Sequence, residues 1–302
     1  MFLVILLLSL FRQNASAADL TDQGGRIIHF EHPFTRIISL YGAHTENLAR
    51  LGLDKEIIGR TGEDDYPQFI ATKPVFSDRD DTEKFIAAHP DLVLIRPMDA
   101  SAHQELFASL QKAGITIVSL QPTSITQMYT YWHDLGELTG KTQEADAMID
   151  EFKSGITQIK ENFVNIPENK RPKVYFESIH SKMRTFSPDS ISIFSLESAG
   201  GINIASDATP RHMTNIAEYG KEQILSHAEN IDVFITQIGA MNRLDKSTIL
   251  TEPGFQAIKA VRDGKVYLID EKLVSRPTMR LLKGIHELNE ILYPTARETV
   301  NQ

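Results

Sequence analysis

The stretch Glu83-Lys-Phe-Ile-Ala-Ala-His-Pro-Asp-Leu-Val-Leu-Ile95 has a counterpart about 140 residues later, Glu222-Gln-Ile-Leu-Ser-His-Ala-Glu-Asn-Ile-Asp-Val-Phe-Ile235. In each copy an acid opens a short helix, an apolar pair follows, and an Asp leads into an all-apolar strand. An apolar run of this length after a short amphipathic turn is typical of a buried parallel strand. The repeat therefore predicts two similar α/β lobes, each with one carboxylate at an equivalent corner, and a cleft between them.

Strand and helix patterns alternate along the first half of the chain. Helices are expected at residues 45–51 and 103–113, and the second is stopped by Gly114. The expected strands are the apolar runs at residues 36–41, 57–59, 92–95 and 115–120. Strands that alternate with helices of this length predict a parallel sheet with helices on both faces, and thus an α/β fold.

The middle of the chain, from Ser124 to about Asn165, has an almost purely helical pattern with a break at Gly140-Lys141-Thr142. After the break, apolar side chains keep helical spacing at Ala145, Met148, Ile149, Phe152, Ile156 and Ile159. A helix from Ala145 to Phe163 would extend ~28 Å at 1.5 Å per residue. That length is enough to run along two lobes rather than inside one.

A second set of strand and helix patterns follows a boundary at Ile166-Pro-Glu-Asn-Lys-Arg-Pro172. Strands are expected at residues 173–177 and, after an Asp-Gly turn, at residues 265–269. A helix from Met279 to about Leu292 closes the chain. The expected organisation is an N-terminal lobe at residues 18–140, a connecting backbone helix at 141–166 and a C-terminal lobe at 172–302.

The first residues indicate export. Residues 2–11 form an apolar run that is too short to span a bilayer, and the small residues Ala15-Ser16-Ala17 follow it. We therefore expect a signal peptide at residues 1–17 and a mature chain that starts at Ala18. The basic residue, Arg12, follows the apolar run instead of preceding it, so a buried N-terminal helix is the alternative.

The chain contains no cysteine. The absence of cysteine argues against disulfides, thiolate metal sites, cysteine nucleophiles and a lipid-modified cysteine anchor. Together with the export signal, this predicts a soluble periplasmic protein. A cysteine-free composition alone would suit a cytoplasmic protein equally well.

The composition excludes one class of partner. The sequence is 41% hydrophobic, and the mature chain has about 285 residues. This is enough for one large or two medium domains. A formal net charge of -9 argues against nucleic acid, because neutralising phosphates needs a basic surface.

The order of short motifs resembles a known family, the periplasmic substrate-binding proteins for iron–siderophores, haem and cobalamin. The similarity covers nearly all of the mature chain. The motifs that carry it are Arg36-Ile-Ile-Ser-Leu, Thr45-Glu46, Leu51-Gly52-Leu53, Asp65-Tyr66-Pro67, Pro90-Asp91-Leu92-Val93, Ala199-Gly-Gly-Ile-Asn203, Asp232-Val233 and Ala260-Val-Arg-Asp-Gly-Lys-Val-Tyr267. Each motif alone is weakly specific, whereas their joint order and spacing are specific.

The resemblance implies two Rossmann-like lobes joined by one long backbone helix, with the ligand between them. It implies a monomer with no intrinsic cofactor that docks on the permease subunits of an importer driven by ATP. One acid on each lobe is implied to meet arginines of the transporter, and Glu83 and Glu222 match those positions. The alternative is local, because a Glu in the first turn of a helix is stabilised by the helix dipole by ~0.3–1 kcal/mol.

Ligands of parallel α/β sheets bind beyond the carboxyl ends of the strands. The loops expected there contain the candidate ligand-binding residues Tyr41, His44, Tyr66, Arg96, Arg184, Arg211, Arg243 and Arg276. Guanidinium groups offer paired donors to carboxylate, catecholate or phosphate oxygens, so a cationic cleft for an anionic metal chelate is expected. Arg96, Arg184 and Arg276 are the leading contacts. The alternative is that these arginines pair with nearby acids such as Asp78, Asp99 and Asp207.

Direct metal ligation is a separate hypothesis. Tyr41, His44, His180 and His212 could approach the cleft, since His is a common metal ligand and Tyr is an axial ligand of haem. The sequence contains no His-x-x-x-His pair, and whether any side chain ligates a metal stays open.

Two other functions compete with chelate binding. A carrier for bare zinc or manganese ions would need several His and carboxylate groups that converge, whereas arginine repels free cations. A chelatase-like enzyme on the same fold is the second rival. The sequence has no nucleophile elbow, Gly-x-Gly-x-x-Gly, phosphate loop or His-Glu-x-x-His, so an enzyme is not expected.

Overall fold

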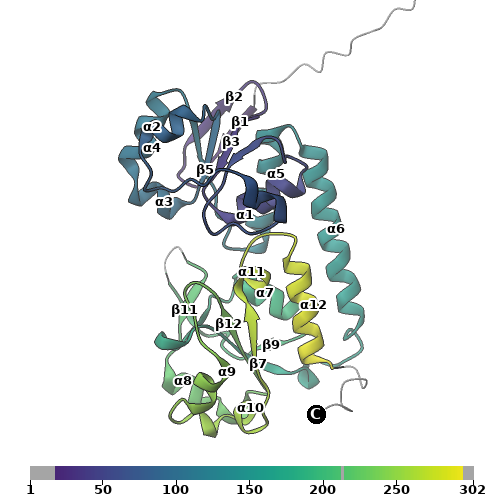
Figure 1. Cartoon of the computed structure of the whole chain (residues 1–302). Coiled ribbons are helices and arrows are strands. Elements are labelled where there is room, and N and C mark those ends of the chain that lie inside the picture. The colour runs from purple at the N-terminus through teal and green to yellow at the C-terminus, as the bar shows by residue number, and fades with distance from the viewer. Residues whose placement is uncertain (1–17, 212–213, 295–302) are drawn as a thin grey trace, which may run out of the picture.

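A computed structural model describes residues 18–211 and 214–294 of the chain. Two α/β lobes lie one above the other in Figure 1, and helix α6 (Thr142–Glu161) runs along the side of both. The expected signal peptide at residues 1–17 lies outside the described residues. Within them, no helix is both long enough and apolar enough to cross a bilayer.

The N-terminal lobe contains a four-stranded sheet in the order β4-β3-β5-β6, and all its strands are parallel. The strands are β3 (Ile37–Ser39), β4 (Ile57–Gly59), β5 (Leu92–Ile95) and β6 (Thr116–Ser119). The helices are α1 (Gly42–Arg50), α2 (Thr82–Ala87), α3 (Pro97–Ala102), α4 (Gln104–Lys112) and α5 (Ile125–Thr139). The parallel sheet that the sequence predicts is confirmed, and every strand ends at the same edge of it.

A hairpin of β1 (Ala18–Thr21) and β2 (Ile27–Phe30) precedes this sheet. The sequence pattern did not predict this hairpin. Its turn is organised by the buried carboxylate of Asp22, which accepts the backbone N–H groups of Gly24 and Arg26 and pairs with the Arg26 guanidinium. The same carboxylate accepts the N–H of Ser119 at the end of β6, which fixes the hairpin to the sheet.

The C-terminal lobe has a sheet in the order β10-β11-β8-β7-β12-β13, with β9 also paired to β7. The strands are β7 (Lys173–Ile179), β8 (Arg184–Phe186), β9 (Ile202–Asn203), β10 (Thr209–Pro210), β11 (Ile216–Glu218), β12 (Val233–Ile238) and β13 (Val266–Asp270). The pairs that β7 forms with β9 and β12, and β12 with β13, are parallel as expected. The edge formed by β8, β11 and β10 is antiparallel.

This antiparallel edge was not predicted, and its cause is a short connection. Only residues 180–183 separate β7 from β8, and Met183 reverses the chain in a left-handed conformation with φ 47°. A parallel return would need a crossover of about a dozen residues or more, so a connection this short forces an antiparallel partner.

The remaining elements cover the C-terminal sheet or connect its strands. The α-helices are α7 (Ile191–Ser198), α8 (Lys221–Ser226), α9 (Lys246–Thr251), α10 (Lys259–Arg262), α11 (Glu271–Val274) and α12 (Leu281–Leu292). Single turns of 3-10 helix occur in both lobes, at η1 (Gln68–Thr72), η2 (Glu168–Lys170), η3 (His180–Lys182), η4 (Ala228–Asn230) and η5 (Phe255–Ala257).

The repeated sequence unit forms the same structure in both lobes. In each copy a short helix, α2 or α8, leads into a buried strand, β5 or β12. The Asp at the entrance of the strand holds the start of the neighbouring strand. Asp91 accepts the N–H of Arg36 at 2.9 Å, and Asp232 accepts the N–H of Lys173 at 3.0 Å.

Helix α6 packs one apolar face against both lobes. The six apolar residues expected on that face, from Ala145 to Ile159, are all buried. Phe152 meets Trp132 of α5 edge to face, with ring centroids 5.3 Å apart, while α7 and α12 pack against α6 from the C-terminal lobe. One apolar core, to which both lobes contribute, therefore continues along the helix.

The segment after β13 returns to the N-terminal lobe and joins it by ion pairs. Glu46 of α1 binds Arg276 at 2.8 Å and Arg280 at 2.7 Å, and its own side chain is almost fully buried. Lys272 binds Asp65 at 2.6 Å. Between these ion pairs, the carbonyl of Pro277 accepts hydrogen bonds from the side chains of Asn47 and Trp132. The two lobes are thus joined by a polar contact as well as by α6.

We expect Glu46→Ala to destabilise the protein by about 2–4 kcal/mol, because it leaves two partly buried guanidinium groups without their carboxylate. Glu151→Ala removes the partner of Arg50 in an exposed pair on the surface and should cost less than about 1 kcal/mol. Chemical denaturation followed by circular dichroism measures both. Equal losses in the two variants would show that the pair between the lobes contributes no more than a surface pair.

Candidate functional site

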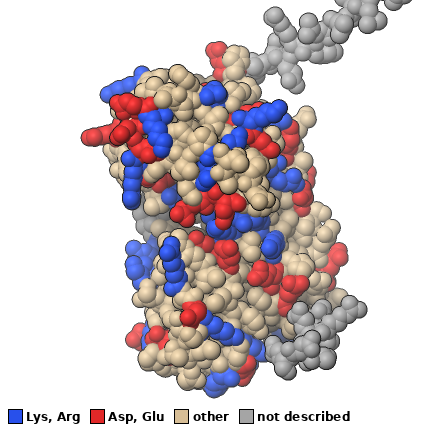
Figure 2. Space-filling model, viewed as in Figure 1, with Lys and Arg blue, Asp and Glu red and all other residues tan. Residues whose placement is uncertain are grey.

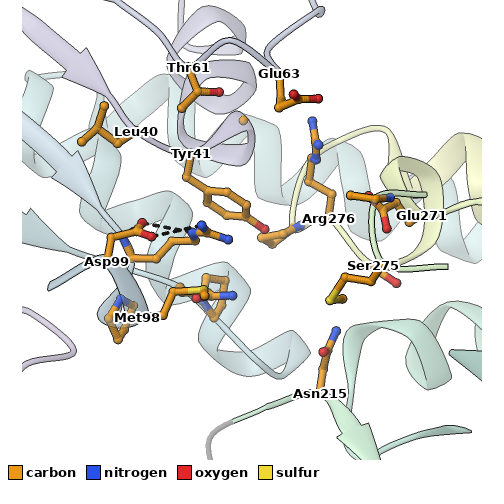
Figure 3. A pocket seen from close by; sticks show the side chains of 18 of the residues that line it. Leu40, Tyr41, Thr61, Glu63, Met98, Asp99, Asn215, Glu271, Ser275 and Arg276 are labelled. Atoms are coloured by element: carbon orange, nitrogen blue, oxygen red, sulfur yellow. Dashed lines mark hydrogen bonds and ion pairs between the residues drawn. The ribbon is translucent and has the colours of Figure 1, made fainter. Parts of the chain in front are cut away.

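A cleft of about 1250 Å³ opens between the two lobes. The loops that follow β3, β4, β5 and β6 form its N-terminal wall, and residues near β11, β12 and α11 form its C-terminal wall (Figure 3). Pockets for ordinary small molecules measure about 300–1,000 Å³, so this cleft suits a larger ligand. The position at the carboxyl ends of parallel strands is the one that the sequence predicts.

Three of the eight candidate ligand-binding residues line this cleft: Tyr41, Arg96 and Arg276. Tyr41 lies between the two arginines, and the Arg96 guanidinium carbon is 4.9 Å from the centroid of its ring. Burial raises the pKa of Tyr41, and the nearby charges of Arg276 and Arg96 offset this only in part. At neutral pH the side chain is therefore a phenol that can form hydrogen bonds, not a phenolate.

The Arg96 side chain is held in the wall by Asp99. Its Nε and Nη2 atoms each lie 3.1 Å from a carboxylate oxygen of Asp99, and the backbone N–H of Arg96 donates to the same group. This arrangement closes the first turn of α3, where Pro97 is the first helical residue. Arg96 therefore enters the cleft already bound to a nearly buried carboxylate.

Arg276 is held in place by its ion pair with Glu46. It approaches the backbone of Gly42 so closely that a Cβ atom there would lie 2.7 Å from its Nη1 atom. Asp64 lies on the same side of Gly42, and its carboxylate accepts hydrogen bonds of 2.6 Å from the hydroxyls of Thr45 and Thr61. Gly42 is thus the residue that allows the first turn of α1, Arg276 and Asp64 to meet.

His44 lies behind the cleft wall. Helix α1 begins at Gly42, three residues before the expected start, so His44 is in the first turn and its ring is buried inside the lobe. One ring nitrogen is 2.7 Å from the Tyr131 hydroxyl and the other is 3.2 Å from the Ile95 carbonyl oxygen. Burial lowers the pKa of His44 to about 3, so the ring is neutral.

The other candidate residues also lie outside the described lining. Tyr66 is an exposed residue whose ring lies under the Arg280 guanidinium, at 4.7 Å. Arg184 and Arg211 both bind Glu218 on the antiparallel edge, where they lower the pKa of its carboxyl to about 2. Arg243 is exposed in the loop after β12. Arg184 and Arg211 were expected at the cleft because their segments were taken as loops, and the antiparallel edge that contains them was not predicted.

Histidine is absent from the described residues that line the cleft. His180 is buried elsewhere in the C-terminal lobe, 2.9 Å from Glu177, and His212 lies outside the described residues. Within residues 18–211 and 214–294, only His133, Asp134 and Glu137 form a group of three that could hold a metal ion. That group is on α5 and does not line the cleft.

The charge of the cleft differs from the cationic cleft that the sequence predicts. The described lining contains two arginines and five carboxylates, which belong to Glu63, Asp64, Asp78, Asp99 and Glu271. Figure 2 shows charged side chains of both signs where the lobes meet. Loop arginines are visible in a sequence, but the acids that surround them in space are not. Gln237 and Ser275 also line the cleft and were not among the candidate residues, because no sequence motif marks them.

The two repeated acids lie outside the cleft. Glu83 is in the first turn of α2 and Glu222 is in the first turn of α8, and both are exposed. Neither forms an ion pair with another described residue. In Figure 1, α2 and α8 lie on the side of their lobes away from α6.

The family model for periplasmic binding proteins matches residues 37–273. This chain belongs to the periplasmic binding protein family. One relative from Bacillus subtilis, named as the uncharacterized ABC transporter substrate-binding lipoprotein YvrC, is 29% identical over 262 residues, which cover 86% of this chain and 80% of that protein.

Solved structures share the fold of this periplasmic binding protein. A protein from Staphylococcus epidermidis, described as a possible iron-binding periplasmic solute-binding protein, aligns with a TM-score of 0.75 and 27% identity over 87% of this chain and all of that one. The periplasmic vitamin B12 binding protein BtuF of Vibrio cholerae aligns with a TM-score of 0.65 and 18% identity, covering 86% and 97%. The second likeness shows the fold alone.

We expect His44 to make this binding protein less stable in acid. Its pKa is about 3 when folded and about 6.5 when unfolded, so acidification favours the unfolded state, which takes up the proton first. The contribution of the neutral His44 ring to the free energy of unfolding is complete above about pH 6.5. It decreases as the pH falls, by ~2 kcal/mol at about pH 5.

The measurement is the free energy of unfolding at about pH 7 and about pH 5 for wild type and His44→Gln. The Gln variant should lose ~2 kcal/mol less than wild type over this interval. His286→Gln, at an exposed position on α12, is the control for a His-to-Gln change outside the core. The same loss in wild type and His44→Gln would contradict the assignment of a neutral buried ring.

Proposed function

We propose that the protein captures a metal chelate, such as an iron–siderophore, a corrinoid or haem, in the cleft between its lobes and delivers it to an ABC importer. The observation that carries the proposal is the cleft itself: it is larger than an ordinary small-molecule pocket, and both lobes contribute to it. We further infer an exported, soluble periplasmic protein that acts as a monomer and without an intrinsic cofactor. The relative named as an ABC transporter substrate-binding lipoprotein supports the transport role.

A chelated metal is favoured over a bare ion by the donor groups of the cleft. Zinc and manganese carriers need several protein ligands at one point, and zinc sites in proteins use His, Cys and carboxylate groups. The described lining offers no His, the chain has no Cys, and no three of the five lining carboxylates lie close enough to share an ion. A ligand that supplies its own donor atoms to the metal needs from this cleft only shape, apolar contact and hydrogen bonds.

Among chelates, a corrinoid or an iron–siderophore is favoured over haem. Tyr41 is the single tyrosine of the described lining, and a tyrosine that ligates haem iron does so as its phenolate. The raised pKa of Tyr41 disfavours that form. Haem would therefore lack a tyrosinate or histidine ligand from the described part of the cleft, where only the thioethers of Met98 and Met241 could act as axial ligands.

Glu83 and Glu222 support docking on a membrane partner. They occupy equivalent places in the repeated unit, are exposed, and leave both carboxylates available to cations of another protein. Because these residues lie outside the cleft, docking and ligand binding are separable by mutation.

Native mass spectrometry of the protein purified from its own periplasm tests the proposed cargo. We expect a co-purifying mass and a visible spectrum that identify a corrinoid, a ferric chelate or haem. Blocking the cleft with Ala240→Trp should abolish this species, because residue 240 lines the cleft and an indole would fill part of it. The exposed Ala102→Trp is the control for a new surface indole. A ligand that is retained by Ala240→Trp would place the binding site elsewhere.

The docking role is tested by the double variant Glu83→Ala/Glu222→Ala. Removing both acids leaves the partner's cations unpaired and should cost a few kcal/mol of docking energy, so uptake into reconstituted vesicles should fall at least about tenfold. Ligand affinity should not change. The control is Glu105→Ala/Glu168→Ala, which also removes two exposed acids from first helical turns. Wild-type uptake by the docking variant would leave both acids with a helix-capping role only.

A further inference from the structure

Both arginines of the described cleft are already bound to carboxylates. Arg96 forms two hydrogen bonds with Asp99, whose side chain is 7% exposed, and Arg276 binds Glu46, whose side chain is 4% exposed. These pairs use the Nε and Nη2 atoms of Arg96 and the Nη1 atom of Arg276, so each guanidinium keeps further N–H donors, but its positive charge is already compensated by a nearly buried carboxylate. Pulling either guanidinium away towards an anionic ligand would leave that carboxylate with less compensation, which is a costly change.

Three carboxylates of the lining have no cationic partner within ion-pair distance among the described residues. Asp64 accepts hydroxyl groups from Thr45 and Thr61, and Glu271 accepts the backbone N–H of Ala240 at 3.1 Å. Glu63 is exposed at the rim, close to Arg276 in Figure 3. Arg276 lies near Asp64 and Glu63 but is already paired with Glu46, so the carboxylates of the cleft outnumber its cations and their excess negative charge acts on whatever enters.

The neutral polar groups of the cleft also favour a ligand without negative charge. Gln121, Gln127 and Asn215 line it with side-chain amides, which both donate and accept hydrogen bonds, whereas the buried amide of Gln237 is already bonded to Ser178 and Ser275. Amide donors can bind the carbonyl oxygens of a neutral ligand without any change in charge. Met98 and Met241 add exposed, adaptable apolar surface on opposite lobes.

We propose that the cleft selects chelates that are neutral or positively charged and carry amide or hydroxamate groups, and that it discriminates against polyanionic chelates such as tricatecholates. This inference rests on the proposed function and names the ligand class of the same cleft. Glu63 and Glu271 are the residues that set the preference, because both face the cleft without a cationic partner. The arginines that the sequence suggests as anion receptors instead shape the wall.

The test uses one metal centre with three charges. A linear ferric trihydroxamate with a terminal ammonium is cationic, its N-acetylated form is neutral, and its N-succinylated form is anionic. A ferric tricatecholate and an amide-bearing corrinoid complete the set. Isothermal titration calorimetry at low and high ionic strength gives the affinity of each probe.

We expect the cationic and neutral probes to bind more tightly than the succinylated probe, and the tricatecholate to bind most weakly. Added salt should weaken the cationic probe and strengthen the anionic ones, because it screens attraction and repulsion alike. Tighter binding of the succinylated probe or of the tricatecholate would overturn the charge preference while supporting chelate binding. If no probe binds, this inference fails, and if haem does not bind either, the proposed function fails with it.

The variant Glu63→Gln/Glu271→Gln assigns the preference to residues. It keeps side-chain size and hydrogen bonding, and it should reduce the ratio of cationic to anionic affinity by about two- to fivefold per carboxylate, the range of an exposed ion pair. The control, Glu105→Gln/Glu168→Gln, removes the same charge outside the cleft and should leave the ratio unchanged. An equal change in both variants would overturn the assignment, since net charge alone would then explain the preference.

Discussion

The apolar face of α6 is the constraint on which the rest of the structure depends. A single helix of 20 residues carries side chains that are buried against both lobes, so neither lobe can move along it without exposing part of a shared core. Close contacts fix the helix at both ends. A Cβ on Gly136 of α5 would lie 2.8 Å from the Cβ of Ala145, and one on Gly155 would lie 2.9 Å from Leu282 of α12. The separation of the lobes, and with it the width of the cleft, follows from this packing.

The second constraint is electrostatic and acts where the segment after β13 meets α1. Glu46 is almost fully buried, and a buried carboxylate is tolerated only with close partners, which Arg276 and Arg280 supply from the other lobe. The same pairing determines what Arg276 offers to the cleft, because a guanidinium that compensates a buried acid is less available to an anion. The contact that joins the lobes therefore also sets the electrostatics of the ligand site.

The repeated unit separates structural from functional acids. In both lobes the Asp before the strand holds the first backbone N–H of the neighbouring strand, so Asp91 and Asp232 are required by the sheet. The Glu that opens the preceding helix has no such partner within the described residues and remains exposed in both lobes. A duplicated fold thus presents two equivalent carboxylates on one side of the molecule, away from the ligand cleft.

The sequence by itself determined the elements that depend on local patterns. Residues 57–59 and 92–95 form the expected strands, and the buried face of α6 consists of the expected six residues, because periodicity reports directly which side chains face a core. It also located the cleft at the carboxyl ends of the strands. The tertiary structure decided which residues reach that cleft. His44 was displaced by a helix that begins three residues early, and Arg184 and Arg211 by an antiparallel edge that a four-residue connection imposes. The sign of the cleft charge was also beyond the sequence, because it depends on carboxylates such as Asp64 and Glu271, which are distant along the chain and line one cleft only when the lobes are joined.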